Sequence, residues 1–582
     1  MDVIYSINGP VVTVAGSKSF CMLEMVYVGN MRLIGEVISV NSDMTTIQVY
    51  EDTGGVCTGE PVVGTGAPLC AVLGPGILSG IFDGIERPLT AIKQQSGDFI
   101  QKGAQTSSLD TKKLWPVHFT VAVGDRVKGG RVFAQTPESE TITHKCLVPP
   151  DISGVVTDIK ADGEYTVFEK VMTVTDDDGA VHELMLSHKW PIKYARPFLN
   201  RRAAAIPLIT GQRVIDTAFP IAKGGAAAIP GGFGTGKTMT QHQIAKWSDA
   251  DIIIYIGCGE RGNEMTQVLE EFSELVDPRT GRPLTERTVM IANTSNMPVA
   301  AREASIYTGV TLAEYYRDMG YHVAIMADST SRWAEALREI SGRLEEMPAE
   351  EGFPAYLPSR LSQFYERAGY VDTLSGTQGS VTIIGAVSPQ GGDFSEPVTQ
   401  NTKRYIRCFW ALDRALANSR HYPAIDWVTS YTEYFDDLED WYSKNISPRF
   451  AAARSRILNI LLEENRLMEI VKLIGEDVLP DDQKLIMQTA SVIRQGFLQQ
   501  NAYHQVDTYV PLDKQYKMMD IILYVYDEAL KLVKKSIPVS QIAALGVFEQ
   551  LIKLKYEKQP DFEKLKAEAG QKLGGLLARY EQ

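Results

Sequence analysis

Apolar runs alternate with amphipathic segments through the middle of this chain of 582 residues. The runs are rich in β-branched residues and have the length of strands buried on both faces. The intervening stretches, such as 239–247 and 298–319, show the apolar spacing of helices. Because strands that alternate with helices form a parallel sheet covered on both faces, we predict an α/β domain over residues 191–435. Its expected strands are 226–229, 252–256, 289–292, 323–327 and 381–387.

Short alternations of apolar and polar residues, typical of strands, precede this region. The first part of the chain joins such runs with closely spaced turns, which predicts a β-barrel over residues 1–70. Residues 71–114 are interpreted as a linker into the α/β region. A second Gly-rich β pattern over residues 115–190 carries no recognisable catalytic group, and we interpret it as an inserted all-β domain.

Helical spacing dominates the remaining residues, 436–582, and predicts a C-terminal helical bundle. One helix is expected to bury a stripe of apolar residues spaced by three and four, and to end at Pro538. The stripe consists of Tyr516, Met519, Leu523, Tyr526, Leu530 and Val533.

Charge and cysteine usage narrow the function classes. The formal net charge is −14, which argues against a protein that coats nucleic acid, since phosphate binding needs clustered Lys and Arg. The six cysteines lie far apart and predict neither a zinc site nor a disulfide framework, which favours a reducing compartment. The first residues do not resemble a signal peptide, and no apolar run reaches the ~18–20 residues of a membrane span.

One motif predicts a phosphate-binding loop. Residues 231–238 fit the pattern G-x-x-x-x-G-K-[ST] and lie between a predicted strand and a predicted helix. Glycines let backbone amides turn toward an anion at a helix N-terminus, Lys237 would reach the β- and γ-phosphates, and Thr238 would bind Mg²⁺. The alternative is a chance Gly-rich turn, which the flanking elements disfavour. The loop consists of Gly231, Gly232, Phe233, Gly234, Thr235, Gly236, Lys237 and Thr238.

Two carboxylates follow buried strands and are candidates to complete a site. Asp328 ends the run 323–327 and would act on Mg²⁺, although an Asp before Ser-Thr is also a good helix cap. Glu260 lies beyond the run 252–256, between glycines, and is a candidate general base. Arg261 would steady the γ-phosphate or hold Glu260, and the alternative for both is a surface ion pair.

Four segments together resemble the catalytic A subunit of V-type and A-type ATPases. The resemblance extends over essentially the whole chain. It implies a P-loop NTPase domain with a RecA-like parallel sheet, and it identifies the 115–190 insert with the extra domain of A subunits. The segments are Gly-Gly-Phe-Gly-Thr-Gly-Lys-Thr (231–238), Gly-Cys-Gly-Glu-Arg-Gly-Asn-Glu (257–264), Ala-Asp-Ser-Thr-Ser-Arg-Trp-Ala-Glu-Ala (327–336) and Gly-Gly-Asp-Phe-Ser-Glu-Pro-Val (391–398).

The resemblance also implies roles and partners. Glu260 matches the water-activating acid, Arg261 its neighbour at the γ-phosphate, and Asp328 the acid that acts on Mg²⁺, most simply through water. ATP or ADP would bind with Mg²⁺, and adenine would contact the aromatic residues Tyr422, Phe497 and Tyr503. Ordinary core packing is the alternative for Phe497 above all.

The family assembles as an alternating A3B3 head, so the B subunit would supply an arginine finger in trans. The resemblance also implies central and peripheral stalks that connect this soluble head, on the cytoplasmic face of the plasma membrane, to an ion-translocating sector. The acidic segment 475–482 matches a region that faces the rotor, although a solvated turn is equally consistent with it. Thr235 replaces the Cys of eukaryotic relatives, which argues against a redox lock there.

Three other functions stay open at this point. A protein-export or flagellar ATPase of the same superfamily is disfavoured by the 115–190 insert and the long helical C-terminal region. A nucleic-acid motor and a non-catalytic nucleotide-binding protein of the same head are the others, and the negative charge disfavours the motor. The sequence distinguishes neither proton from sodium transport nor hydrolysis from synthesis.

Overall fold

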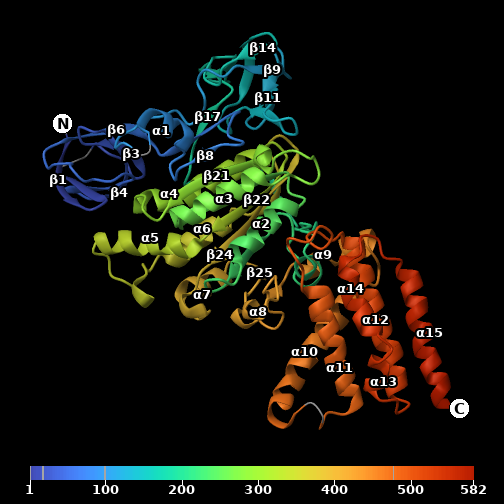
Figure 1. Cartoon of the computed structure of the whole chain (residues 1–582). Helices are drawn as coiled ribbons and strands as arrows, with labels where there is room; N and C mark the ends of the chain where they lie inside the picture. The colour runs from blue at the N-terminus through green and yellow to red at the C-terminus, as the bar shows by residue number, and fades with distance from the viewer. Residues whose placement is uncertain (1, 16–18, 98–99, 476–477, 582) are drawn as a thin grey trace. The chain divides into compact units, whose positions relative to one another are not determined.

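The computed structural model describes residues 2–15, 19–97, 100–475 and 478–581 (Figure 1). The chain forms two compact units, each built from separate stretches of sequence. The first contains Met1–Ala203, Lys223–Ala228 and Ala250–Ile406, and the second contains Ala204–Ala222, Ile229–Asp249 and Arg407–Gln582. Within the described residues, no helix has both the length and the apolar character needed to span a bilayer.

A closed six-stranded barrel begins the first unit, as the sequence predicts. Its strand order is β1-β2-β5-β4-β3-β6. Alternate residues such as Val26 and Val28 on β3, Val37 on the adjacent β4 and Ile47 on β5 are fully buried and fill the barrel interior. The strands are β1 (Asp2–Asn8), β2 (Val11–Ala15), β3 (Glu24–Val28), β4 (Leu33–Val40), β5 (Met44–Val49) and β6 (Pro61–Pro68).

The region predicted as an all-β insert forms two four-stranded sheets, with orders β12-β11-β9-β14 and β10-β13-β15-β16. Its chain then returns through β17 (His188–Pro191), which pairs with β7 (Cys70–Leu73). The insert strands are β9 (Trp115–Phe119), β10 (Arg126–Val127), β11 (Val132–Pro137), β12 (Thr143–Leu147), β13 (Gly154–Ile159), β14 (Gly163–Tyr165), β15 (Met172–Thr175) and β16 (Val181–Leu184).

A parallel sheet with the order β8-β21-β20-β22-β24 forms the centre of the first unit. Its edge strand β8 comes from residues 71–114, so this stretch does more than link two regions. An antiparallel pair, β18 (Asn200–Arg202) and β23 (Gly369–Asp372), extends it beyond β24. These strands are β8 (Ile81–Phe82), β20 (Ile252–Glu260), β21 (Thr288–Thr294), β22 (His322–Asp328) and β24 (Gln378–Val387), and the residues of β19 (Ala226–Pro230) are divided between the two units.

Helices pack on this sheet, and α4 is buried along almost all of its length (Figure 1). The parallel register pairs Ile256 with Ala327 and Gly257 with Asp328, so β20 and β22 end at the same edge of the sheet. The helices of the first unit are α1 (Leu89–Ser96), α3 (Gly262–Glu274), α4 (Val299–Asp318), α5 (Thr330–Arg343), α6 (Leu357–Tyr365) and α7 (Pro397–Lys403).

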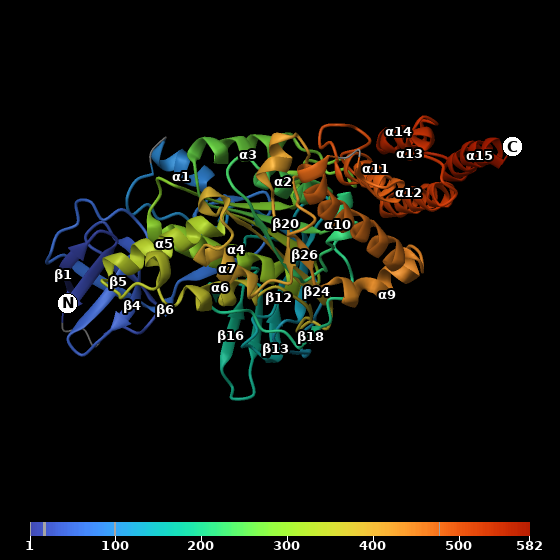
Figure 2. The ribbon, with the colours of Figure 1, turned by 90° about the horizontal axis from the view of Figure 1, so that it is seen from below.

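The second unit contains the helical bundle, in which α10, α11, α12 and α15 pack side by side (Figure 1, Figure 2). It also contains α2 (Lys237–Trp247) and the strand pair β25 (Cys408–Phe409) and β26 (Tyr431–Thr432). The other helices are α8 (Arg414–Asn418), α9 (Phe435–Asn445), α10 (Phe450–Ile474), α11 (Asp481–Val492), α12 (Leu512–Val533), α13 (Val539–Ala543), α14 (Val547–Lys553) and α15 (Phe562–Glu581), with the short helices η1 (Val214–Ala218), η6 (Ile493–Leu498) and η7 (Leu554–Tyr556).

The predicted helix around residue 523 exists, but its expected end and buried stripe are partly wrong. It ends at Val533, before Ser536 adopts a φ of 63°, and Pro538 begins the next helix instead. Of the predicted stripe only Met519 and Leu523 are buried. Several helices surround α12, so its buried face is wider and centred on the neighbouring positions Met518, Ile522, Val525, Ala529 and Leu532.

Candidate functional site

The predicted phosphate loop connects β19 to α2 and lies in the second unit from Ile229 onward. Gly236 precedes α2 with a φ of 89°, a left-handed conformation that glycine adopts without steric cost. A Cβ atom on Gly231 would lie 2.6 Å from Thr235 Oγ1 and 2.8 Å from Leu412 Cβ, so only glycine fits there. The strand, the left-handed turn and the helix N-terminus together form the backbone of an anion-binding loop.

Two side chains of this loop donate hydrogen bonds to its own backbone. Lys237 Nζ donates to the carbonyl oxygens of Gly231 at 2.7 Å and Gly232 at 3.1 Å, which holds the ammonium group over the loop. Thr235 Oγ1 also donates to Gly232 O, at 2.8 Å. Phe233 is exposed at the tip. Thr238 is the second residue of α2, so its hydroxyl lies in the first turn, where a Mg²⁺-binding residue of such a loop is expected.

In the first unit, Glu260 is the last residue of β20, which continues beyond the predicted run because it stays paired with β21 up to Thr294. Burial raises the pKa of Glu260 to about 8, and the negative charge of Asp328 and a hydrogen bond with Glu264 add to this, against the positive charge of Arg332. A carboxyl group with a pKa close to neutral pH is suited to accept a proton from water.

Asp328 ends β22 and is almost fully buried. Tyr255 on the adjacent strand donates its hydroxyl to Asp328 Oδ2 at 3.3 Å. Burial, and then the charge of Asp328, raise the pKa of Tyr255 well above its usual range, so this hydroxyl stays a donor. Carboxylate oxygens can ligate Mg²⁺ or accept hydrogen bonds from its bound water.

Arginines around Glu260 differ in part from those expected. Arg261 immediately precedes α3, and its side chain is exposed. Arg332, in the first turn of α5, and Arg302, on α4, both pack against Gly259, where a Cβ would lie within about 3 Å of each. Sequence reasoning missed these two arginines. Arg332 follows Asp328 by four residues in the motif 327–336, which was the available signal for it.

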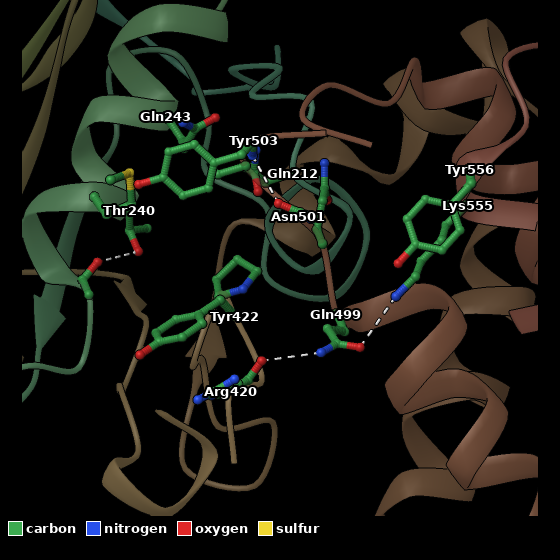
Figure 3. A pocket seen from close by; sticks show the side chains of 15 residues that line it. Gln212, Thr240, Gln243, Arg420, Tyr422, Gln499, Asn501, Tyr503, Lys555 and Tyr556 are labelled. Carbon is green, nitrogen blue, oxygen red and sulfur yellow. Dashed lines mark hydrogen bonds between the residues drawn. The ribbon is translucent and has the colours of Figure 1, made fainter. Parts of the chain in front are cut away.

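A cavity of about 630 Å³ lies beside the phosphate loop within the second unit (Figure 3). Tyr422 and Tyr503 both line it, as expected for adenine-contacting residues. Tyr422 also approaches the loop, since a Cβ on Gly236 would lie 3.4 Å from Tyr422 Cε1. Aromatic faces beside a phosphate-binding loop suit a purine nucleotide.

Polar contacts fix the position of the chain segments that line this cavity. Arg213 forms a fully buried ion pair with Asp507 at 2.6 Å and donates to the carbonyl of Gln499 at 2.7 Å. Gln499 in turn donates to Arg420 O and accepts from Lys555 Nζ (Figure 3). The segment that carries Tyr503 is therefore fixed to the core of the second unit.

Phe497 differs from the other two aromatic candidates. Its ring is 1% exposed in the core, and it is not among the residues that line the cavity. It lies in η6, whose carbonyl oxygen at Phe497 accepts a hydrogen bond from Arg213. Tyr556 lines the cavity instead. The sequence analysis missed it, because it lies more than 50 residues after Tyr503 and no motif surrounds it.

The acidic segment 475–482 is only partly described. Residues 476 and 477 lie outside the described part of the chain, so the segment as a whole cannot be compared with its expected role. Asp481 and Asp482 begin α11 in its first turn.

Profiles of known families match most of the chain. "ATP synthase alpha/beta family, nucleotide-binding domain" matches residues 211–432, and "C-terminal domain of V and A type ATP synthase" matches residues 439–543. The barrel-sandwich domain and the β-barrel domain of the same family match residues 106–193 and 4–66.

Individual relatives are similar over almost their whole length. The V-type ATP synthase alpha chain 2 of Clostridium tetani is 61% identical over 95% of this chain and 93% of its own. The V-type ATP synthase alpha chain of Halothermothrix orenii is 58% identical over 100% of this chain and 97% of its own. The A subunit of the A-type ATP synthase of Methanopyrus kandleri is 57% identical over 95% of this chain and 94% of its own.

Among solved structures, the assembled ATPase EscN from the type III secretion system of enteropathogenic E. coli has a similar fold. Its TM-score is 0.64 at 20% identity, over 90% of this chain and 100% of EscN. That identity supports a common fold only. The profiles and the full-length relatives go further: this chain belongs to the ATP synthase alpha/beta family, among the alpha and A subunits of V-type and A-type ATP synthases.

Proposed function

We propose that this chain is the catalytic A subunit of a rotary ATPase that couples ATP hydrolysis, or synthesis in reverse, to the transport of protons or sodium ions. The observation that carries the proposal is the loop 231–238, an anion-binding turn next to an aromatic cavity in a chain of this family. The full-length relatives, which are named as chains of V-type and A-type ATP synthases, support the coupling to transport.

Each residue has a defined task in this proposal. The loop amides and Lys237 bind the phosphates, while Tyr422 and Tyr503 contact the adenine. Glu260 accepts a proton from the attacking water, and Arg261 stays a candidate for orienting it or the γ-phosphate. The hydroxyl of Thr238, together with Asp328 acting through water, would hold Mg²⁺, which supplies positive charge that neutralises the phosphate oxygens.

The partners proposed are those of the family. A B subunit would alternate with this chain in an A3B3 head and contribute an arginine finger, so the chain alone would hydrolyse ATP poorly. Central and peripheral stalks would connect the head to a membrane sector, on the cytoplasmic face. The exposed position of Arg261 is consistent with a need for a further cation from a neighbouring chain.

The decisive experiment measures ATP turnover by the complex reconstituted with its B subunit. Glu260→Gln should lower turnover by about 10²–10⁴-fold and preserve nucleotide binding, because it removes only the proton acceptor. Lys237→Ala should abolish tight Mg-ATP binding as well. Glu270→Gln, an exposed acid on α3, is the matched control and should keep wild-type turnover. Turnover within a few-fold of wild type in both site variants would refute the catalytic assignment.

A further inference from the structure

A second cavity of about 500 Å³ lies in the second unit and has no part in the proposed ATP site. Three lysines, Lys514, Lys517 and Lys558, line it together with a single acid, Asp513. The rings of Tyr509 and Phe562, two prolines, two glutamines and Val506 complete its lining. We refer to it as the lysine cavity. An excess of cations in a concave site beside aromatic rings is the chemistry that recognises a small oxyanion.

The floor of the lysine cavity carries a fixed positive charge. Lys514 is 8% exposed, and its Nζ donates to Glu557 O at 2.6 Å, which positions the ammonium group. Burial lowers the pKa of Lys514, and the positive charge of Arg213 lowers it further, against the negative charges of Asp507 and Glu557. An anion bound beside Lys514 would add a negative charge that stabilises the ammonium form.

The two more exposed lysines of the lysine cavity add positive charge on side chains that can reorient toward a ligand. Lys517 is half exposed and pairs with Asp513 at 2.7 Å, while Lys558 is exposed on the opposite chain segment. The N-terminal turns of two long helices, α12 and α15, also begin among the lining residues. Their helix dipoles favour an anion at the same place.

A short set of contacts joins the lysine cavity to the nucleotide cavity. Tyr509, in the wall of the lysine cavity, stacks on Trp247 with ring centroids 5.1 Å apart. Trp247 is the last residue of α2, the helix that begins at the phosphate loop, and it donates to Thr508 Oγ1 at 3.1 Å. Thr508 Oγ1 donates to Gln243, which lines the nucleotide cavity.

We propose that the lysine cavity binds a small oxyanion of the phosphate class, either inorganic phosphate or a sugar phosphate, and that this binding changes nucleotide affinity through Tyr509 and Trp247. The site does not depend on the catalytic roles proposed above. Its binding is measured with the phosphate loop already occupied, so its failure would leave the ATPase assignment unaffected.

Calorimetric titration of the full chain tests the binding. The chain is saturated with a non-hydrolysable Mg-ATP analogue in phosphate-free buffer and titrated with inorganic phosphate or with ribose 5-phosphate. The wild type should bind at least one of them, more weakly as ionic strength rises. The double variant Lys517→Ala/Lys558→Ala should lose at least tenfold in affinity, and the tighter of the two probes identifies the source of the phosphate group.

A matched control and a second measurement complete the test. The control variant Lys531→Ala/Lys564→Ala removes one exposed lysine from α12 and one from α15, neither of which lines the lysine cavity. Its affinity for phosphate should stay within twofold of wild type. Equal affinity in all three proteins, or no binding by the wild type at millimolar concentrations, would overturn the proposal. Coupling requires that phosphate change nucleotide Kd at least threefold in the wild type and the control but not in Lys517→Ala/Lys558→Ala. Direct competition at the phosphate loop would persist in that variant and would refute the coupling.

Discussion

Burial shifts the pKa values of Glu260, in the first unit, and of His421, in the second unit, in opposite directions. It raises the pKa of Glu260 to about 8, because the charged form of an acid is disfavoured away from water. It lowers the pKa of His421 to about 4, with smaller contributions from the positive charges of Arg494 and Lys555. His421 directly precedes Tyr422, which lines the nucleotide cavity. Protonation of the buried imidazole would therefore destabilise the fold next to this cavity.

The His421 shift predicts a loss of stability in acid. The unfolded chain binds a proton near the ordinary pKa of about 6.5, while the folded chain resists protonation until about pH 4. Between these values the unfolded state holds more protons, so stability falls as pH is lowered, by at most about 3 kcal/mol. Above pH 6.5 this contribution is constant.

Thermal unfolding of wild type and His421→Gln between pH 7 and pH 4 checks this expectation. The wild type should lose Tm more steeply than the variant as pH decreases, because the variant has no imidazole to protonate. The comparison uses the slopes, so any constant cost of the substitution cancels. Parallel slopes across this range would show that the imidazole is not held neutral in the fold.

At the scale of elements, the buried pair of Arg213 and Asp507 fixes the segment between η6 and α12 that carries part of the nucleotide cavity. Asp507→Ala would leave the guanidinium of Arg213 buried without its counter-charge, which typically costs about 3–5 kcal/mol. We therefore expect a large drop in Tm and weaker binding of nucleotide. Differential scanning calorimetry and a nucleotide titration measure the two effects.

An exposed pair of the same chemistry provides the control. Arg456 and Asp527 form an ion pair with two contacts, but both side chains are nearly half exposed to solvent. Asp527→Ala should cost less than about 1 kcal/mol, since water replaces the lost partner. A similar loss in both variants would mean that burial does not govern the strength of the Arg213 pair.

Elements with a strong local signal could be predicted from the sequence. The apolar runs that became β20 and β22 are uninterrupted, so both strands were predicted and Asp328 was placed correctly at the end of β22. Strand β20 continues four residues beyond its predicted run and includes Glu260. Features that depend on packing partners could not be predicted in the same way. The buried face of α12 is set by its neighbouring helices, and Tyr556 reaches the nucleotide cavity only because of the tertiary path of the chain.

At the scale of the whole molecule, a buried polar cluster fastens the all-β insert to helix α4 of the first unit. His144 on β12 contacts Glu138 at 2.7 Å and the hydroxyl of Tyr315, on α4, at 2.9 Å. The hydroxyl of Tyr316 donates to the same carboxylate at 2.9 Å. Burial raises the pKa of Glu138, but His144 and two backbone amides outweigh it and hold the pKa below its ordinary value. Residues more than 170 positions apart thus share one charged acceptor.

Removing that acceptor should loosen the insert while the helical bundle of the second unit keeps its stability. Glu138→Ala leaves the side chains of His144 and Tyr316 and two backbone amides without their buried partner, and each unpaired group costs about 1–3 kcal/mol. Hydrogen exchange should become faster in residues 115–184 and stay unchanged in α10–α15. Glu169→Ala, which removes a half-exposed acid of the insert that pairs with Lys160, should leave both regions as in wild type. Unchanged protection of the insert in Glu138→Ala would contradict this role, because the cluster would then contribute nothing to holding the insert in place.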